Sequence, residues 1–415
     1  MKRKVIKMNL DDNKFQNLDF SKATYLGYTH EALKMLGGIH TAREIDQQPE
    51  LWLKTTALLA GCLPELRAFL GTAFSEEKLE VILTGAGSSA YIGSILKGPF
   101  QKNTGKHTRA IGTTELLTHP LHYFNEQDVV LLVSFARSGN SPESVAVLEL
   151  ADRLCKKVYH LIVTCSATGR LAMSTGGENE YLFLLPGQAD DQSLVMTSSF
   201  TSMLLAGLAL SRLEDFAQFS EQVDILAAYG RKVIQEYAPR LKEVAALDFR
   251  RAIFLGSGAL QGTAEEAQLK MLEMTAGSVI GKSDSFLAFR HGPKAVIDAS
   301  SLMVYLFSNE PYSLQYEKDL VAAVNAGERG LYSIGVMENG SQVEGLDLEI
   351  SLTGPGKKID EALLAVCGIV PVQVLGFYKS LQCGLRPDNP SDSGTITRIV
   401  QGVNIYPFNR NIQED

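Results

Sequence analysis

The sequence predicts an α/β protein with two doubly wound parallel sheets, and three observations support this prediction. From residue 79 onward, short apolar runs alternate with amphipathic helical stretches. The runs are rich in β-branched residues and are not interrupted by polar ones, which is typical of strands buried on both faces of a parallel sheet. After a long helical region the pattern restarts, so one α/β unit occurs twice in the chain.

The elements follow in order along the chain. A helical stretch at 29–39 precedes Pro49, which suits a helix start and leads into a helix over 51–70. A long helical region at about 221–246 separates the two units. Strands are expected in the first unit at 79–84, 128–135 and 158–165, and in the second at 251–258, 301–307 and 331–336. The predicted organisation is an N-terminal helical extension (1–50), a first domain (51–215), a second domain (216–386) and a C-terminal tail (387–415) that lies over a surface.

Composition excludes several classes of protein. A chain of 415 residues is too long for one ordinary core, so two domains are expected. The 39 basic and 47 acidic side chains give a net charge of −8, which argues against a nucleic-acid binder. Five scattered cysteines without a CxxC pair give no disulfide framework and no metal site, and they suit a reducing cytoplasm. No apolar run approaches the ~20 residues of a membrane span, and the basic N-terminus lacks an apolar signal region.

One stretch of the second unit has the character of an active site. Glu266, Lys270 and Glu273 lie four and three residues apart, so a helix would place them on one face. His291-Gly292-Pro293 follows a short loop later. A carboxylate within reach of two adjacent sugar carbons can move a proton between them, and a histidine can open a sugar ring. The alternative is a solvated helix with charge pairs and an ordinary loop histidine.

Two loops of the first unit carry small hydroxyl residues where a strand ends and a helix begins. Gly87, Ser88 and Ser89 follow the first strand, while Arg137, Ser138 and Ser141 follow a neighbouring one. Free N–H groups and the positive dipole end of a helix hold phosphate there, and serine hydroxyls add donors. The alternative is that the serines only cap the helices. The first loop also fits the dinucleotide fingerprint, but no acidic residue follows about 20 positions on.

The chain resembles a known family in these same motifs. TGAGSSAYIG, SFARSGNSPES and VMTSSFTSML are similar to the first sugar isomerase (SIS) domain of glucosamine-6-phosphate synthase, and EEAQLKMLEMTAG with FRHGP resembles its second. EIDQQP resembles the segment that precedes this tandem pair. The terminal VQGVNIYPF run points to the AgaS type within the family. The resemblance covers residues 40–400 and implies two flavodoxin-like three-layer domains.

The resemblance also implies roles for individual residues. It places Ser89, Ser138 and Ser141 at the substrate phosphate, and Thr197 at another substrate-side hydroxyl. Glu273 falls on the carboxylate that moves the proton between C1 and C2, supported by Glu266 and Lys270. His291 falls on the ring-opening histidine, which reaches in from a neighbouring subunit, so a homodimer or larger homo-oligomer with a shared site is expected.

Two departures from the synthase limit the analogy. About 50 residues without a cysteine replace its glutaminase domain, so this chain is not expected to take ammonia from glutamine. The tail has no lysine at 387–394, which argues against a Schiff base from that position.

The sequence thus predicts an enzyme that acts on a sugar phosphate without a cofactor. AgaS-type proteins are galactosamine-6-phosphate deaminases or isomerases, so the expected reaction converts galactosamine-6-phosphate to tagatose-6-phosphate and ammonia. A tagatose-6-phosphate ketose/aldose isomerase would use the same residues. A non-catalytic sugar-phosphate sensor is the other alternative, although such a regulator would usually carry a DNA-binding or partner module, and none is apparent.

Overall fold

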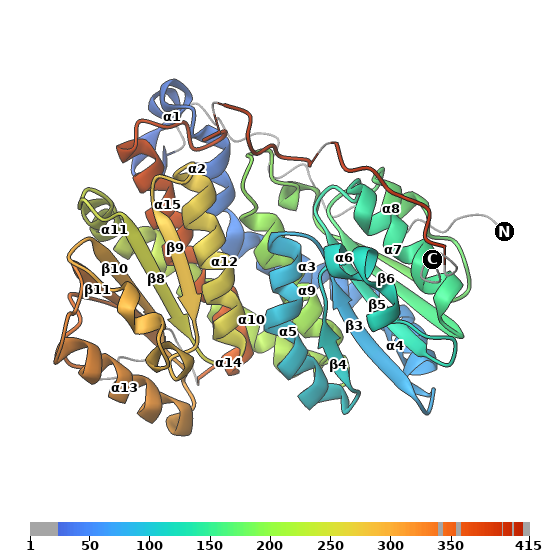
Figure 1. Cartoon of the computed structure of the whole chain (residues 1–415). Coiled ribbons are helices and arrows are strands. Elements are labelled where there is room, and N and C mark those ends of the chain that lie inside the picture. Colours follow the sequence, from blue (N-terminus) through green and yellow to red (C-terminus); the bar gives the residue numbers. More distant parts are fainter. Residues whose placement is uncertain (1–23, 339–342, 354–357, 392, 401, 410–415) are drawn as a thin grey trace.

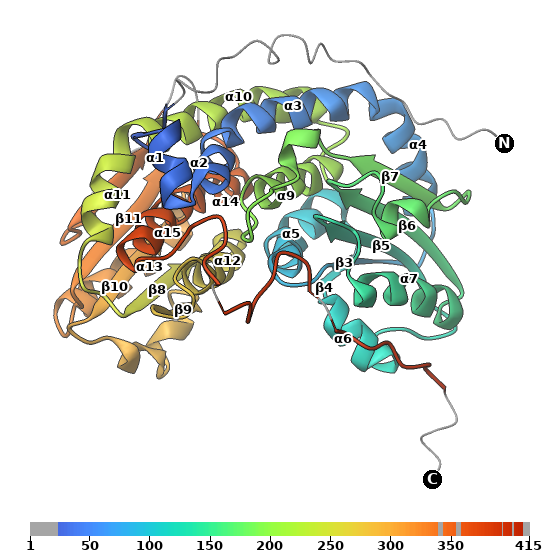
Figure 2. The same ribbon diagram turned by 90° about the horizontal axis from the view of Figure 1, so that it is seen from above.

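Two five-stranded sheets lie on either side of a central layer of helices (Figure 1). The computed structural model describes residues 24–338, 343–353, 358–391, 393–400 and 402–409. Figure 2 shows the same layers from above, with the first sheet on the right and the second on the left. All strand pairs within the two sheets are parallel.

The two sheets share one topology. The first has the order β4-β3-β5-β6-β7, and the second has the order β12-β11-β10-β8-β9. When the strands of each sheet are counted along the chain, both orders read 2-1-3-4-5, the flavodoxin-like arrangement. The prediction of two doubly wound parallel sheets is therefore confirmed. The strands are β3 (Leu79–Thr84), β4 (Thr108–Ala110), β5 (Val129–Ala136), β6 (Lys157–Thr164), β7 (Glu180–Leu184), β8 (Arg251–Gly256), β9 (Ile280–Asp284), β10 (Ser301–Leu306), β11 (Tyr332–Glu338) and β12 (Leu348–Leu352).

Two helical stretches expected to be continuous are broken, at a glycine or near a proline, and a third is helical throughout. The helix predicted over 51–70 is wrong: α3 (Gln48–Gly61) and α4 (Leu63–Phe74) meet at an angle of 71°. Pro64, at the second position of α4, has no N–H to continue the first helix. Likewise, α1 (His30–Leu36) and α2 (Ile39–Asp46) are separated at the left-handed Gly37. The region at 221–246 is helical as predicted: α10 (Phe216–Lys232) continues through a π-helical segment (Val233–Tyr237) into α11 (Ala238–Ala245).

The inner faces of both sheets pack into one continuous core. Successive residues of a strand point to opposite faces, so Val81 and Leu83 face the central helices while Ile82 faces outward. The central layer contains α5 (Ser88–Thr104), α9 (Ser198–Leu210), α12 (Ala259–Met274), α14 (Glu361–Gly368) and α15 (Val370–Gln382). The outer face of the first sheet is covered by α6 (Thr113–Thr118), α7 (Pro142–Leu154) and α8 (Arg170–Met173), and that of the second by α13 (Pro311–Asn325).

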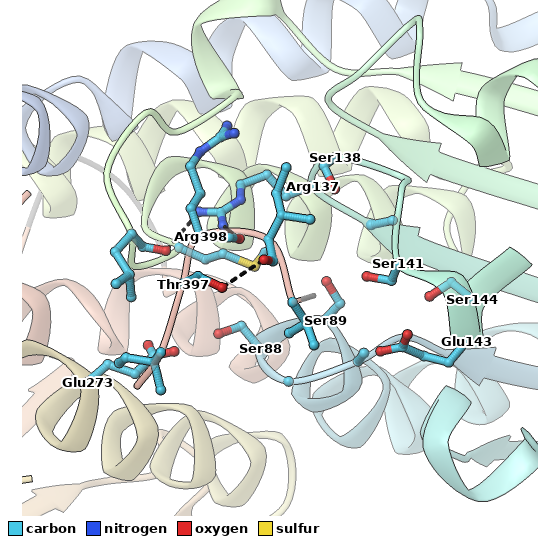
Figure 3. A pocket seen from close by; sticks show the side chains of 18 of the residues that line it. Ser88, Ser89, Arg137, Ser138, Ser141, Glu143, Ser144, Glu273, Thr397 and Arg398 are labelled. Atoms are coloured by element: carbon cyan, nitrogen blue, oxygen red, sulfur yellow. Dashed lines mark hydrogen bonds between the residues drawn. The ribbon is translucent and has the colours of Figure 1, made fainter. Parts of the chain in front are cut away.

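A close contact between two helices of the central layer joins the two halves of the molecule. A Cβ at Gly262 of α12 would lie 2.8 Å from the backbone nitrogen of Ile95 in α5, so only glycine fits there. The two helices run in opposite directions, because the end of α12 lies beside the start of α5 (Figure 3). Residues from the second half therefore reach the loops of the first.

Both chain ends cross between the halves. The hairpin of β1 (Thr24–Tyr25) and β2 (Tyr28–Thr29) precedes α1 and α2, and the Tyr378 hydroxyl of α15 donates to Leu26 O at 2.8 Å. After α15 the C-terminal tail leaves the second half and runs over the first, past α5 and α6 (Figure 2).

Candidate active site

The two serine loops lie side by side at the carboxyl edge of the first sheet. They follow β3 and β5, which are paired neighbours in the sheet. The turn after β3 requires glycine twice: a Cβ at Gly85 would lie 2.7 Å from Ser89 O, and Gly87 has φ +57°. Because the turn is this tight, α5 begins directly at Ser88, and both Ser88 and Ser89 border the same space as the loop after β5.

Both loops border one cavity of about 510 Å³. The first half contributes Ser88, Ser89, Ser138 and Ser141, which point into it (Figure 3). The second half contributes Glu273 from the last turn of α12, and the tail contributes residues 394–400. The cavity therefore exists only because both halves and the tail meet there.

The serine side chains are not used to cap the helices they precede. Ser141 is the N-cap residue of α7, but its hydroxyl makes no capping hydrogen bond in the described structure. The N-cap of α5 is Gly87, which has no side chain. Ser138 Oγ accepts only from the nearby Asn140 N, at 3.3 Å. The hydroxyls of both loops thus border the same space as two helix starts, whose positive dipole ends favour an anion there.

On α12, the predicted row of acid, base and acid forms one chain of ion pairs. Lys270 is fully buried and pairs with Glu273, while Glu266 Oε1 lies 3.4 Å from its Nζ. Burial opposes the charge of Lys270, yet the two carboxylates raise its pKa above the ordinary value. Only Glu273, with 22% of its side chain exposed, reaches the cavity. Lys270 therefore acts on the cavity through Glu273.

Glu266 is the strongly perturbed acid of this row. Neither of its oxygens has a hydrogen-bond partner with good geometry among the described residues, and its side chain is fully buried. Burial raises its pKa to about 8; the charge of Lys270 acts against this increase, and that of Glu273 adds to it. Burial thus favours the protonated form of Glu266, whereas Glu273 is held in place by its ion pair with Lys270.

Arg137 lines the cavity, but its guanidinium is occupied by main-chain carbonyls. Nη1 donates to Ser193 O at 3.2 Å and to Leu194 O at 3.1 Å, and Nη2 donates to Arg398 O at 2.5 Å. Burial lowers its pKa from the ordinary value. The arginine thus joins the serine loop to the tail rather than pointing freely into the cavity.

The structure does not bring two of the predicted residues into the cavity. Thr197, at the start of α9, is fully buried, and its N–H donates to Asp191 Oδ2 at 2.8 Å. His291 follows the short helix η6 (Ala288–Arg290) at the edge of the second sheet, where it is exposed to solvent. Neither is among the residues that line the cavity, so their roles stay predictions.

Several cavity residues were missed from the sequence. Glu143 and Ser144 of the first turn of α7 line it, and Glu143 is buried with Oε2 unpartnered. The SPES letters that follow the serine loop could have suggested both. The tail residues Thr395, Thr397 and Arg398 could not have been found, because nothing in their local pattern places them at a site 250 residues away in the chain.

Two further findings concern metals and membranes. Across the described ranges, no three His, Cys, Asp or Glu side chains are grouped as metal ligands. The α14–α15 stretch, Glu361–Gln382, is long and apolar enough to cross a membrane, but 94% of its most apolar window is buried inside the protein, as in a core helix.

Two flavodoxin-like sheets with serine loops at a shared cavity define the class: an α/β protein of the sugar isomerase kind. The family model for the SIS domain matches residues 73–212, which contain the first sheet. The D-galactosamine-6-phosphate deaminase AgaS of a Shewanella species is 37% identical over 91% of this chain and 94% of its own. A protein of the same name from Escherichia coli is also 37% identical, over 89% of this chain and 96% of its own.

A solved structure extends the likeness to three dimensions. The tagatose-6-phosphate ketose/aldose isomerase of Escherichia coli superposes with a TM-score of 0.83 at 33% identity, over 94% of this chain and all of that one. The chain therefore belongs to the AgaS family of SIS-domain enzymes.

Proposed function

We propose that this protein converts galactosamine-6-phosphate to tagatose-6-phosphate and ammonia. The observation that supports this most is the placement of one carboxylate, Glu273, in a cavity that otherwise presents serine hydroxyls and two helix starts. A phosphate at the serine loops would leave the sugar chain extending toward α12. The names of the AgaS relatives give the substrate class.

The reaction needs one base that serves two adjacent carbons. After ring opening, Glu273 removes the C2 proton, and the electron pair forms the C1–C2 double bond of an enolamine while the C1 oxygen gains a proton. The same carboxyl then returns its proton to C1, which leaves an imine at C2. Water adds to that imine and releases ammonia and the C2 ketone. The ion pair with Lys270 holds Glu273 in place.

His291 would open the ring in the cavity of a neighbouring copy. It is exposed on its own chain and lies outside that chain's cavity, so a homodimer with shared sites is part of the proposal. Mixing inactive Glu273→Gln with inactive His291→Ala protein should then restore activity, to about a quarter of wild type, because half the dimers are mixed and each has one intact site.

A matched control uses two residues of the same cavity. Glu273→Gln mixed with the double variant Ser138→Ala, Ser141→Ala should restore nothing, because these residues line the cavity of one chain. Equal recovery in both mixtures, or none in the first after verified subunit exchange, would refute the shared histidine.

The alternative reaction is plain ketose/aldose isomerisation, favoured by the name of the solved Escherichia coli relative. Oxygen would replace nitrogen at C2, with the same residues. The test is to incubate the purified protein with galactosamine-6-phosphate and measure ammonia and ketose phosphate in parallel. Equal amounts of both products support deamination. Interconversion of tagatose-6-phosphate and the aldose without ammonia release supports isomerisation, and no turnover of either sugar supports a sensor.

We further propose that the protein acts in the cytoplasm. All five cysteines are free thiols, as a reducing compartment favours.

A further inference from the structure

The loop at residues 190–196, between β7 and α9, fixes two arginines that hold the wall of the cavity. Two of its residues, Leu194 and Met196, line the cavity themselves. Its carbonyls at 193 and 194 accept from Arg137. The conformation of this loop therefore determines where the guanidinium of the serine loop lies.

The same loop holds the tail. Arg398 Nε donates to Asp191 O at 2.8 Å, and Nη2 pairs with Asp190 Oδ1 at 2.7 Å. In return, the carbonyl of Arg398 accepts from Arg137 Nη2. Hydrogen bonds thus join Arg137 and Arg398 to each other and to the 190–196 loop. Tail residues 394–400 lie over the serines (Figure 3).

Beneath this loop lies Glu44 of α2, a residue with no part in the chemistry proposed above. Its Oε1 accepts from Gln192 N at 2.6 Å, and Ser193 N lies 3.4 and 3.3 Å from the two oxygens. Oε2 also accepts from Ser193 Oγ. Glu44 is 1% exposed and Ser193 is fully buried, so water cannot replace these bonds.

Burying a charged carboxylate at this position costs free energy, so the hydrogen bonds that Glu44 accepts have to offset that cost. Burial, together with the neighbouring charge of Asp191, raises the pKa of Glu44 to about 7. Arg43 Nη2 is the nearby cation, at 3.8 Å. Three donors converge on the carboxyl group, and an ionised carboxylate is the side chain that accepts from all three without presenting a donor of its own.

A second connection fixes the tail to the same helix. The carboxylate of Asp388 accepts from Thr41 N at 2.7 Å and His40 N at 3.2 Å at the start of α2. The carbonyl of Asp388 accepts from Leu194 N at 2.9 Å. The helix that carries Glu44 therefore holds both the 190–196 loop and the beginning of the tail.

We propose that Glu44 is a positioning residue: it holds the 190–196 loop so that Arg137 and Arg398 keep the tail closed over the substrate cavity. This inference rests on the proposed function for its kinetic consequence. The loop and tail form the binding wall, whereas the base, Glu273, comes from α12. Loss of Glu44 should therefore raise KM for the sugar phosphate and leave kcat nearly unchanged.

The experiment compares Glu44→Ala and Glu44→Gln with wild type, using kinetics and limited trypsin digestion of the folded protein. Trypsin cleaves after Arg398 only when its guanidinium leaves Asp190 and Asp191. Glu44→Ala removes the acceptor of Gln192 N and Ser193 N, so cleavage after Arg398 and KM should both rise about tenfold or more. Glu44→Gln keeps one acceptor oxygen, and Ser193 Oγ can donate instead to Val195 O, now 3.1 Å away. It should recover most of the protection.

Glu317→Gln is the matched control. Glu317 is also a fully buried carboxylate whose pKa burial raises to about 7, but it contacts Ser308 in the other half. It should change neither KM nor cleavage after Arg398. Wild-type cleavage in Glu44→Ala, or equal effects in Glu317→Gln, overturns the positioning role.

The digestion requires no turnover, so it tests the role of Glu44 even if the protein proves not to be a deaminase. If Glu44→Ala does not fold, Glu44→Gln decides: unchanged cleavage together with a KM like that of Glu317→Gln overturns the inference, and a smaller increase in both supports it.

Discussion

In both halves, a glycine turn and the helix that starts after it border a hollow at the carboxyl edge of the sheet, which we call a cradle. The two cradles contain different side chains. Gly87 before α5 has φ 57° and ψ −129°, and Gly258 before α12 has φ 58° and ψ −126°. In the first half the cradle is lined by serines and opens into the cavity. In the second half the chain's own carboxylates occupy it: Glu317 accepts from Ser308 N at 2.9 Å, and Glu361 accepts from Ser308 Oγ.

The long helices α5 and α12 carry opposite charges at equivalent positions. Counted from their first residues, Ser88 and Ala259, the fifteenth residue is Lys102 in α5 and Glu273 in α12. Each helix ends at the cradle of the other half. Burial raises the pKa of Glu361, and the charge of Lys102 acts against it. In the second half a cation lies near carboxylates that hydrogen-bond to the protein, whereas in the first half a carboxylate lies beside serines and helix starts at an open cavity. Side chains, not the backbone, decide which cradle is available to a ligand.

The largest expected effect comes from removing the charge of Glu273 at the end of α12. Glu273→Gln keeps the shape but removes the base, so kcat should fall by ~10²–10⁴-fold while sugar-phosphate binding is retained. Lys102→Gln, at the equivalent position of α5, should leave kcat unchanged. Steady-state kinetics and calorimetric binding on both variants check this. Turnover of Glu273→Gln within a few fold of wild type would exclude Glu273 as the proton carrier.

The next largest effect is expected when serine hydroxyls are removed from each cradle. Ser138→Ala with Ser141→Ala should weaken substrate binding, since each hydrogen bond lost to a charged group is worth roughly 1.5–3 kcal/mol. In the second cradle the Ser257 hydroxyl hydrogen-bonds to Glu317. The matched pair, Ser257→Ala with Ser308→Ala, should lower the melting temperature and leave the affinity unchanged. Dissociation constants and thermal melts of both variants separate the cases. The reverse pattern would mean that the first-half serines are structural.

The smallest effect is on stability and depends on pH. Burial raises the pKa of Glu317 from the ordinary 4.5 to about 7 in the folded protein. The folded state therefore binds this proton more tightly than the unfolded state, so the stabilisation is complete below pH ~4.5 and is lost as pH rises toward 7. Glu317→Gln stays neutral, so it should be more stable than wild type at pH 8, by up to about 3 kcal/mol, and similar at pH 5.

Denaturant unfolding at the two pH values measures this difference. Glu310→Gln on the same loop is the control, because Glu310 is exposed. A Glu317→Gln protein that loses stability at pH 8 would show that the ionised carboxylate is needed in the second cradle.

The central strands of both sheets could be predicted from the sequence, and the edge strands could not. The six predicted strands lie within two residues of β3, β5, β6, β8, β10 and β11. The four missed strands are the two edges of each sheet: β4, β7, β9 and β12. Central strands have a continuous apolar signal, since both faces are buried. An edge strand such as β9, with the letters IGKSD, is half exposed and lacks that signal.

The candidate site also has a part that the sequence predicts and a part that it does not. The serine loops and the α12 row depend on spacing within one turn or one helix, so local patterns predict them. Glu44 acts on Ser193, 149 residues later, and Arg398 lies 261 residues from Arg137. Contacts over such separations leave no local pattern, and the resemblance supplied only the residues of its own motifs. The continuity of helices was also overestimated at Gly37, which ends α1, and before Pro64, where α4 begins in a new direction.

The most direct test of the shared cavity is a crystal structure of Glu273→Gln protein soaked with galactosamine-6-phosphate. We expect the phosphate at Ser89, Ser138 and Ser141, with C1 and C2 of the sugar within hydrogen-bond reach of position 273 and the tail closed over them. A phosphate bound at Ser257 and Ser308 in the second half, or a sugar whose C1 and C2 point away from α12, would contradict it.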